Sequence, residues 1–258
     1  MPKKINKPLL RNTLKKLRRV PFDRSEPTNA AMAPQEMLDF LAMLAGIKPV
    51  CLVGRGFDDP NWVAGVEALA GEMKLHIVRG PQWHAEPKLA GLPAWYAEED
   101  RNPTEGSVVY ICKSRSVAAE LREVCASAAI IVDQEARLLG YAPCCVRDHY
   151  RRDRMFDEAF TLMLRRTARG DEKEMRRIVR EAVKMSVETE QEQALMEEAT
   201  DRRPARFTSV NMCRLCADDR DSPAAQMSHQ YEALAHAVDP RLASEIRRIE
   251  MHYDALER

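Results

Sequence analysis

Two pairs of cysteines have a type and a spacing that could hold a metal. Cys144 and Cys145 are adjacent, and Cys213 and Cys216 form a Cys-x-x-Cys motif. Two intervening residues allow one loop to direct both sulfurs at a single centre, as in structural zinc sites and iron–sulfur clusters. One Cys-x-x-Cys is only moderately specific, whereas two pairs in one chain favour a shared metal site.

The first pair follows Pro143, which suits the first turn of a helix because its missing N–H would have no partner there. At this position, free N–H groups and the positive end of the helix dipole favour thiolate over thiol. His149 lies four residues after Cys145, on the same helical face and within reach of a shared ion. The sequence thus predicts two cysteine ligands here and a histidine as a further candidate.

Three ligand sets are compatible with these residues. Cys144, Cys145, Cys213 and Cys216 could hold a [4Fe–4S] cluster; Cys145, His149, Cys213 and Cys216 could hold zinc; or three cysteines could hold a cluster with one open iron. The adjacent pair favours the iron–sulfur cluster, because separate irons accommodate neighbouring sulfurs more easily than one small tetrahedral ion does. Zinc is the alternative.

The cysteines could also have roles that need no metal. Free cysteine is among the most buried residue types, so all four could be small core residues. We expect that role for Cys51, Cys112 and Cys125, which lie on predicted strands or on an apolar helix face. A redox dithiol at the Cys-x-x-Cys is a further alternative, but the usual βαβ context of that motif is missing.

Residues 140–146, GYAPCCV, also resemble a short signature, Gly-Tyr-Pro-Pro-Cys-Cys-Val, of a group of uncharacterised prokaryotic proteins. The resemblance covers only these seven residues, and Ala142 stands in place of the first proline. It implies that the adjacent cysteines are a deliberate feature. It implies no reaction, since no activity is associated with that group.

The composition is that of an ordinary soluble protein. The chain has 258 residues, 45% of them hydrophobic, and its 40 basic residues balance 40 acidic ones. No apolar run approaches the roughly 18 to 20 residues of a membrane span, and the basic N-terminus lacks the apolar region of a secretory signal. We therefore expect a cytoplasmic protein, in which seven cysteines indicate metal ligands or reactive thiols rather than disulfides.

Residues 1–30 form a predicted basic amphipathic arm. Nine lysines and arginines face two acidic residues, a net charge of +7, while Leu10, Leu14 and Leu17 recur at helical spacing. Either the arm packs its leucines on the body and leaves its charges in water, or residues 1–24 contact an acidic partner such as RNA. The sequence leaves both possibilities open.

Residues 31–142 alternate between helical and apolar extended segments. The expected strands are 49–54, 75–79, 107–112 and 128–132, and the expected helices are 35–46, 59–73 and 116–126. Short, fully apolar strands separated by helices are typical of a parallel sheet covered on both faces. The sequence therefore predicts an α/β domain with a small parallel sheet of about four strands. The long segment 80–106 contains two tryptophans and is expected to be an ordered flap or binding loop.

Residues 143–258 have a helical pattern. Helices are expected at 143–168 and 171–200, followed by a linker and two closing helices near 223–237 and 240–256. The first two are expected to form an antiparallel hairpin, which returns the chain close to its start. This helical region would thereby bring the two cysteine pairs together in one metal site.

Two basic residues at the carboxyl ends of predicted strands could bind an anion. Arg55 lies between two glycines after the first strand, and Lys113 follows the strand at 107–112. Ligands of open parallel sheets bind at that edge. We therefore expect Arg55 and Lys113 to orient an anionic ligand, although a tight turn with an aspartate N-cap accounts for the glycines equally well.

Two hypotheses of function follow. The first is an iron–sulfur enzyme that acts on a small molecule in redox or sulfur chemistry, with Arg55 and Lys113 orienting an anionic substrate. The second is a non-enzymatic binding or adaptor protein, in which zinc stabilises the helical region and the basic arm contacts an acidic partner. Loss of the metal distinguishes them, because it should unfold the helical region only in the second case.

Overall fold

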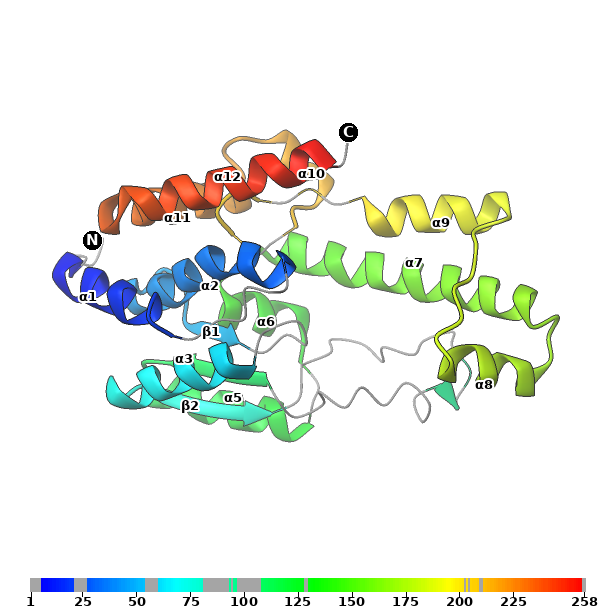
Figure 1. The fold of residues 1–258 in the computed structure, drawn as a ribbon, viewed down its shortest axis with the longest axis horizontal. Coiled ribbons are helices and arrows are strands. Elements are labelled where there is room, and N and C mark those ends of the chain that lie inside the picture. The colour runs from blue at the N-terminus through cyan, green and yellow to red at the C-terminus, as the bar shows by residue number, and fades with distance from the viewer. Residues whose placement is uncertain are drawn as a thin grey trace.

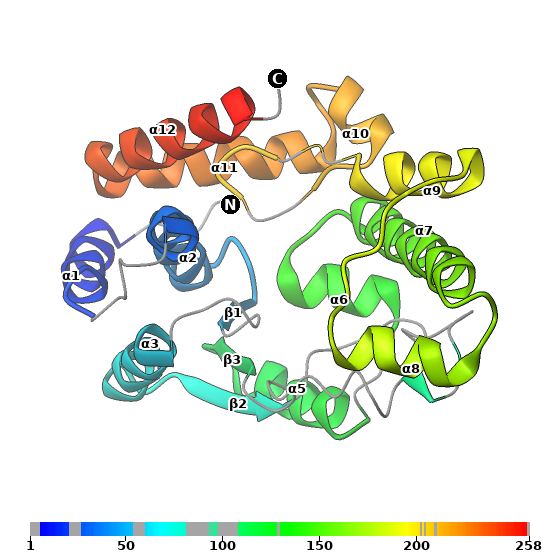
Figure 2. The same ribbon diagram turned by 45° about the vertical axis from the view of Figure 1, so that its right-hand side comes forward.

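The computed structural model of the chain describes residues 6–20, 27–53, 60–80, 93, 95–96, 108–127, 130–201, 203, 205–208 and 211–256. Most of these residues are helical, and three short strands form one sheet (Figures 1 and 2). The strands are β1 (Val50–Val53), β2 (His76–Gly80) and β3 (Val108–Cys112). The helices are α1 (Lys7–Leu17), α2 (Pro27–Ala45), α3 (Pro60–Glu72), α5 (Arg115–Ser127), α6 (Val132–Leu139), α7 (Pro143–Thr167), α8 (Glu172–Arg180), α9 (Glu190–Thr200), α10 (Arg214–Asp218), α11 (Pro223–Val238) and α12 (Pro240–Leu256). Within the described part of the chain, no helix has the length and apolar character needed to cross a membrane.

β3 is the central strand of the sheet. It pairs with β1 on one side and with β2 on the other, and it is antiparallel to both. Cys112 lies opposite Val50 of β1 and opposite His76 of β2. The connection through α3 therefore joins two strands that run in the same direction but are separated by the strand that follows them, as in a split βαβ unit.

The predicted parallel sheet of about four strands is therefore wrong. All five residues of β3 are buried. A fully apolar run indicates that both faces of a strand are covered, and a central strand satisfies this condition in either direction. The apolar pattern thus identified the buried strands β1 and β3 but carried no information about their direction.

The fourth expected strand, at 128–132, has no counterpart among the described residues. Val132 instead begins α6, and Ile131 immediately before it is 69% exposed. Asp133 and Glu135 lie in the first turn of α6, where their charges favour the positive end of the helix dipole. The helical preference of the following residues thus overrides the β-branched run.

Helices cover both faces of the sheet and create two cores. On one face, Val109 and Ile111 of β3 pack in a core with residues of α1, α2, α3, α11 and α12. On the other face, Val108, Tyr110 and Cys112 pack with α5 and α6. Successive residues of β3 point to opposite faces, so the single strand contributes to both cores.

The basic helix α1 packs on the first of these cores. Leu10, Leu14 and Leu17 are each at most 3% exposed, as expected if the arm buries its leucines on the body. Arg18 forms ion pairs with Asp239 at 3.0 Å and Glu245 at 3.2 Å. Residues of all three predicted segments, 1–30, 31–142 and 143–258, belong to this core. The division of the chain into these segments stays a prediction.

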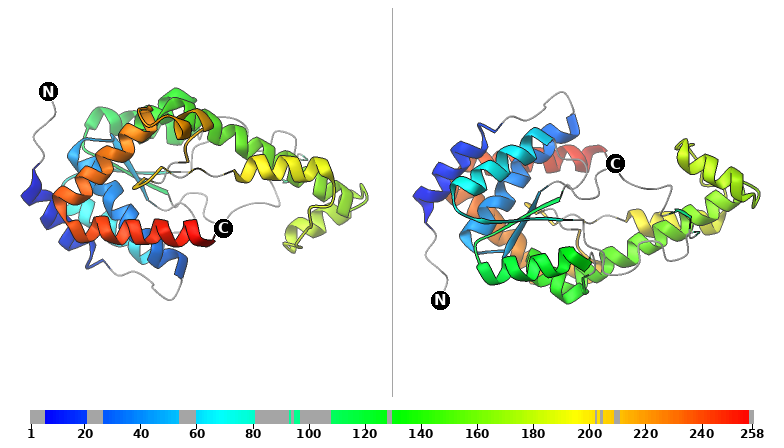
Figure 3. Two further views of the ribbon diagram at one scale, coloured as in Figure 1. Left: turned by 90° about the horizontal axis from the view of Figure 1, so that it is seen from above. Right: turned by 90° about the horizontal axis from the view of Figure 1, so that it is seen from below.

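The helices α7 and α9 lie side by side and antiparallel, and with α8 they project from the rest of the molecule (Figure 3). The helix expected over 171–200 is interrupted, since α8 ends at Arg180 and 183–188 has no regular structure. Ala182 adopts a φ of 48°, and Thr189 starts α9 through a capping box with Glu192. This capping signal is hidden inside a sequence that reads as one long helix.

Candidate metal centre

The two cysteine pairs meet at the starts of α7 and α10. Pro143 is the first residue of α7, so Cys144 and Cys145 occupy its first turn. Cys213 is the N-cap of α10, and Cys216 lies within that short helix. All four sulfur atoms lie within 4.8 Å of one another. This cysteine cluster is compatible with a metal-binding protein.

The return of α9 along α7 brings the second pair back to the first. Near the end of α9, the Asp201 carbonyl oxygen accepts a hydrogen bond of 3.0 Å from Nη1 of Arg152 on α7. Beyond it, the Met212 N–H donates to the Arg203 carbonyl at 2.6 Å, directly before Cys213. The helical pair therefore positions the second half of the cluster, as the hairpin predicted from sequence requires.

Direct contacts join the pairs across the cluster. The sulfurs of Cys144 and Cys216 lie 3.4 Å apart, and the Cys213 N–H donates to the Cys145 sulfur at 3.4 Å. Both cysteines of the first contact are free, since a disulfide would place their sulfurs about 2.05 Å apart. Each cysteine of one pair therefore contacts the other pair.

The four thiols differ in their access to solvent. Cys145, Cys213 and Cys216 are buried, with exposed fractions of 1%, 7% and 4%. Cys144 is half-buried and lines a surface cleft of about 440 Å³. The other residues of the cleft are Val132, Arg147, Asp148, Tyr150, Arg151 and Arg154. Among the four thiols, only Cys144 thus lines this cleft.

Burial and mutual hydrogen bonds give the three buried thiols different pKa values. Burial raises the pKa of Cys145 strongly, and burial together with the Cys144 thiol raises the pKa of Cys216 to about 11. Burial acts to raise the pKa of Cys213 as well, but the Cys216 N–H and the surrounding thiols donate to its sulfur and lower it overall. Because metal ligation requires thiolates, a bound cation would displace the protons that burial retains.

Backbone and hydroxyl contacts hold the second pair in place. The Ser222 hydroxyl donates to the Cys216 carbonyl at 2.9 Å, while the Ala225 N–H donates to the same hydroxyl at 3.3 Å. Ser222 is the N-cap of α11, so one side chain connects the cysteine motif to the start of the next long helix. The motif is thereby fixed relative to the body of the protein.

His149 is not part of this cluster. Its side chain is 52% exposed, and its Nε2 lies 3.5 Å from an Asp153 carboxylate oxygen. One turn of α7 separates it from Cys145, but the Cys145 thiol is buried in the core whereas the His149 side chain lies at the surface. Among the described residues, the group of close ligand atoms consists of the four cysteines alone.

Of the two residues expected to bind an anion, only Lys113 lies among the described residues. Lys113 donates from Nζ to the Leu44 carbonyl at 2.8 Å, so it binds the C-terminal end of α2. It adjoins the end of β3 next to Val50, where β1 begins, because the strands are antiparallel. Arg55 follows the opposite end of β1 in the sequence and lies outside the described residues.

The three remaining cysteines lie outside the cluster. Cys51 and Cys112 are buried on β1 and β3, and Cys125 of α5 is half-buried. The first belongs to the core on one face of the sheet, and the other two pack on the opposite face. These positions agree with the core roles expected from the apolar sequence around them.

A buried polar network around Lys48 was not anticipated from sequence. Lys48 and Asp39 are 2% and 7% exposed, and their charged atoms lie 2.6 Å apart. The Tyr231 hydroxyl donates to the same carboxylate at 3.1 Å, and the Lys48 ammonium lies 5.3 Å from the centre of the Tyr141 ring. An aspartate inside the apolar sequence MLDFLAML was the available signal.

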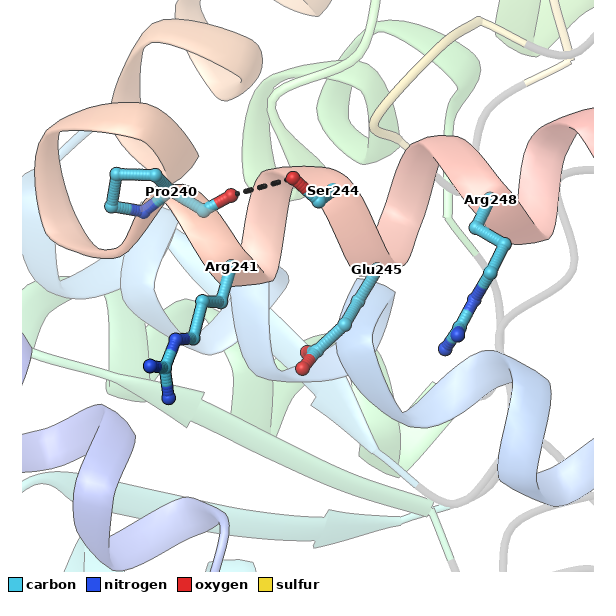
Figure 4. A pocket seen from close by; sticks show the side chains of 5 residues that line it. All are labelled: Pro240, Arg241, Ser244, Glu245 and Arg248. Carbon is cyan, nitrogen blue, oxygen red and sulfur yellow. Dashed lines mark hydrogen bonds between the residues drawn. The ribbon is translucent and has the colours of Figure 1, made fainter.

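A second surface cleft, of about 460 Å³, lies along α12. Pro240, Arg241, Ser244, Glu245 and Arg248 line it, and Figure 4 shows Arg241, Glu245 and Arg248 pointing to the same side of the helix. The Glu245 carboxylate in this cleft is already paired with Arg18 of α1. Its described lining contains no cysteine, whereas Cys144 lines the first cleft.

Comparison of the chain with known protein families, with curated proteins and with solved structures finds no match. The resemblance of residues 140–146 to a short cysteine signature therefore gains no support from these comparisons. Function has to be inferred from the cysteine cluster and its surroundings.

Proposed function

We propose that the four cysteines form a structural zinc site that holds the helical region together. The observation that carries this proposal is the spacing of the sulfurs, all within 4.8 Å of one another. Four thiolates on one tetrahedral zinc lie about 2.3 Å from the ion and therefore about 3.8 Å from one another. The cluster thus needs only small adjustments to surround a single ion.

The same spacing argues against the iron–sulfur alternative. In a [4Fe–4S] cluster each thiolate binds a different iron, so the iron–iron separation adds to the distance between sulfurs. The adjacent pair was the reason to favour the cluster over zinc, yet the sulfurs of Cys144 and Cys145 both fall within the compact group. This geometry supports a zinc ion bound by the four cysteines, without His149 as a ligand.

Burial supports a structural rather than a catalytic role. A catalytic zinc site keeps one position open for water or substrate, whereas four cysteine ligands close the coordination sphere. Three of the four cysteines are also members of the first hydrophobic core. The ion would join the start of α7 to the segment between α9 and α11, at the base of the projecting helices (Figure 3).

The biochemical role that fits a closed site is that of a non-enzymatic binding or adaptor protein. Lys7 and Lys15 on α1 and Arg19 just after it are exposed and could contact an acidic partner such as RNA. This part of the proposal is limited by the fold, because Arg18 is already paired with acidic residues of the body. Salt-sensitive RNA binding that is lost on charge reversal of these three residues would support it.

Metal analysis of protein purified without oxygen tests the zinc proposal. We expect one zinc per chain and no visible absorption. A Cys144→Ser, Cys145→Ser double variant should lose the zinc, whereas Cys125→Ser, outside the cluster, should retain it. Stoichiometric iron and sulfide with a broad visible band would replace the zinc proposal by the iron–sulfur enzyme, and absence of any metal would reject the shared site.

A further inference from the structure

We propose that Cys144 is a peroxide-sensitive thiol of the zinc site, and that its oxidation releases the ion by forming a Cys144–Cys216 disulfide. The proposal rests on the proposed zinc site and adds a modification site with a defined partner. Three observations carry it: the position of Cys144 at the surface cleft, its contact with Cys216, and the hydrogen bond that the Cys145 sulfur accepts from the Cys213 N–H.

The first observation is access. Cys144 is half-buried and lines the cleft of about 440 Å³, while each of the other three cysteines is at most 7% exposed. A small neutral oxidant such as hydrogen peroxide fits a cleft of this size. Oxidation of cysteine follows exposure and thiolate character, and zinc ligation supplies the thiolate. The first oxidation is therefore expected at Cys144.

The second observation selects the partner. The sulfurs of Cys144 and Cys216 lie 3.4 Å apart, so their approach to a bond of about 2.05 Å requires a movement of little more than 1 Å. The Cys145 sulfur accepts a hydrogen bond from the Cys213 N–H, which holds these two residues to one another. Cys216 is thus the sulfur best placed to attack an oxidised Cys144.

The chemistry balances with peroxide as the oxidant. The Cys144 thiolate attacks one peroxide oxygen, so an S–O bond forms, the O–O bond breaks and hydroxide leaves. The Cys216 thiolate then attacks the resulting sulfenic sulfur, which forms the S–S bond, breaks the S–O bond and releases a second hydroxide. Two thiolates together lose two electrons and peroxide gains them. The ion keeps only two thiolate ligands and is released.

The disulfide would preserve the connection that the metal provides. It joins the first turn of α7 to α10, the same two elements that the zinc site joins. The oxidised, zinc-free protein should therefore keep its helices in place, unlike protein from which zinc is removed by a chelator under reducing conditions. Thiol reductants would restore the zinc site.

The test uses the full-length zinc-loaded protein and hydrogen peroxide. Zinc release is followed with a colorimetric chelator, and disulfides are mapped by peptide mass spectrometry. We expect one zinc released for each linked Cys144–Cys216 peptide, with both changes reversed by reductant and added zinc. Cys144→Ser should lose the linked peptide, whereas Cys145→Ser, which removes one ligand from the same site, should still form it on oxidation.

The outcomes separate the two proposals. Failure of the reduced protein to bind zinc overturns the proposed function, and the release step with it. Zinc binding followed by a Cys145–Cys213 link, or by sulfinic acid at Cys144 without any disulfide, overturns the redox inference alone. If peroxide does not release the bound zinc, the redox inference is likewise wrong while the zinc site stands.

Discussion

The Lys48 ammonium lies 2.6 Å from the Asp39 carboxylate in the interior of the protein, where both side chains are buried. Burial opposes the charged form of Lys48, yet the attraction of Asp39 and the neighbouring groups raises its pKa overall. Asp39 belongs to α2, and Lys48 belongs to the segment between α2 and β1, so the ion pair links these two parts of the chain. The Tyr231 hydroxyl links the ion pair to α11. This network therefore joins α2 and the segment before β1 to the C-terminal helix α11.

Loss of one partner of this pair is expected to be strongly destabilising. Lys48→Met leaves the Asp39 carboxylate buried without its cation, and we expect a loss of about 3–5 kcal/mol in the free energy of unfolding. Chemical denaturation measures this change. Adding Asp39→Leu to Lys48→Met removes both charges, so the double variant should be more stable than Lys48→Met alone. If the double variant instead loses as much stability as the two single variants together, the two charges are not energetically coupled and the prediction is wrong.

Glu192 predicts a pH dependence of stability. The Arg166 guanidinium, which binds it at 2.8 Å, and two backbone N–H groups lower its pKa to about 2. A lowered pKa in the folded state stabilises the protein above the ordinary glutamate value of about 4.3. This contribution should disappear as the pH falls from about 4.5 to about 2.

Thermal unfolding of Glu192→Gln over this pH range checks the prediction. The variant should be less stable than the original protein at pH 7, by about 1–3 kcal/mol, with a smaller difference between them in acid. Glu190→Gln is the matched control, because Glu190 lies in the same first turn of α9 but is exposed. A difference that stays constant from pH 7 to pH 2 would refute the role of this carboxylate.

Gly140, the C-cap of α6, should be needed for the close approach of this turn to Lys48. It has a φ of 76°, and a Cβ on it would lie 2.8 Å from Cβ of Lys48. We expect Gly140→Ala to lower the free energy of unfolding by about 1–3 kcal/mol through backbone strain and crowding. Gly71→Ala is the control, since nothing lies within 4 Å of its added Cβ, and it should be neutral or slightly stabilising.

Removal of zinc should destabilise the protein without unfolding all of it. At a free zinc concentration about a hundredfold above Kd, binding contributes about 3 kcal/mol, which corresponds to a decrease in Tm of roughly 5–10 °C on chelation. Hydrogen exchange should increase first in the segment 211–222, which carries the second cysteine pair, and least in β3. Uniform exchange throughout the chain would instead indicate that the metal is required for the entire fold.

The sequence by itself determined the local features of this protein. Pro143 predicts the start of α7, the leucine spacing predicts the buried face of α1, and the two cysteine motifs predict which residues could share an ion. These features depend on neighbours within a few positions along the chain. The apolar run of β3 likewise predicted a strand buried on both faces.

Only the tertiary structure decided how these pieces are combined. The direction of β3 depends on pairing with distant strands, which an apolar run cannot encode because burial is the same in both directions. His149 and Cys144 lie on one helix, yet packing of α10 beside the first turn selects the cysteine and leaves the histidine in solvent. The spacing of residues along a helix determines the face on which a side chain lies. Packing between distant segments of the chain decides whether that face contacts another element or the solvent.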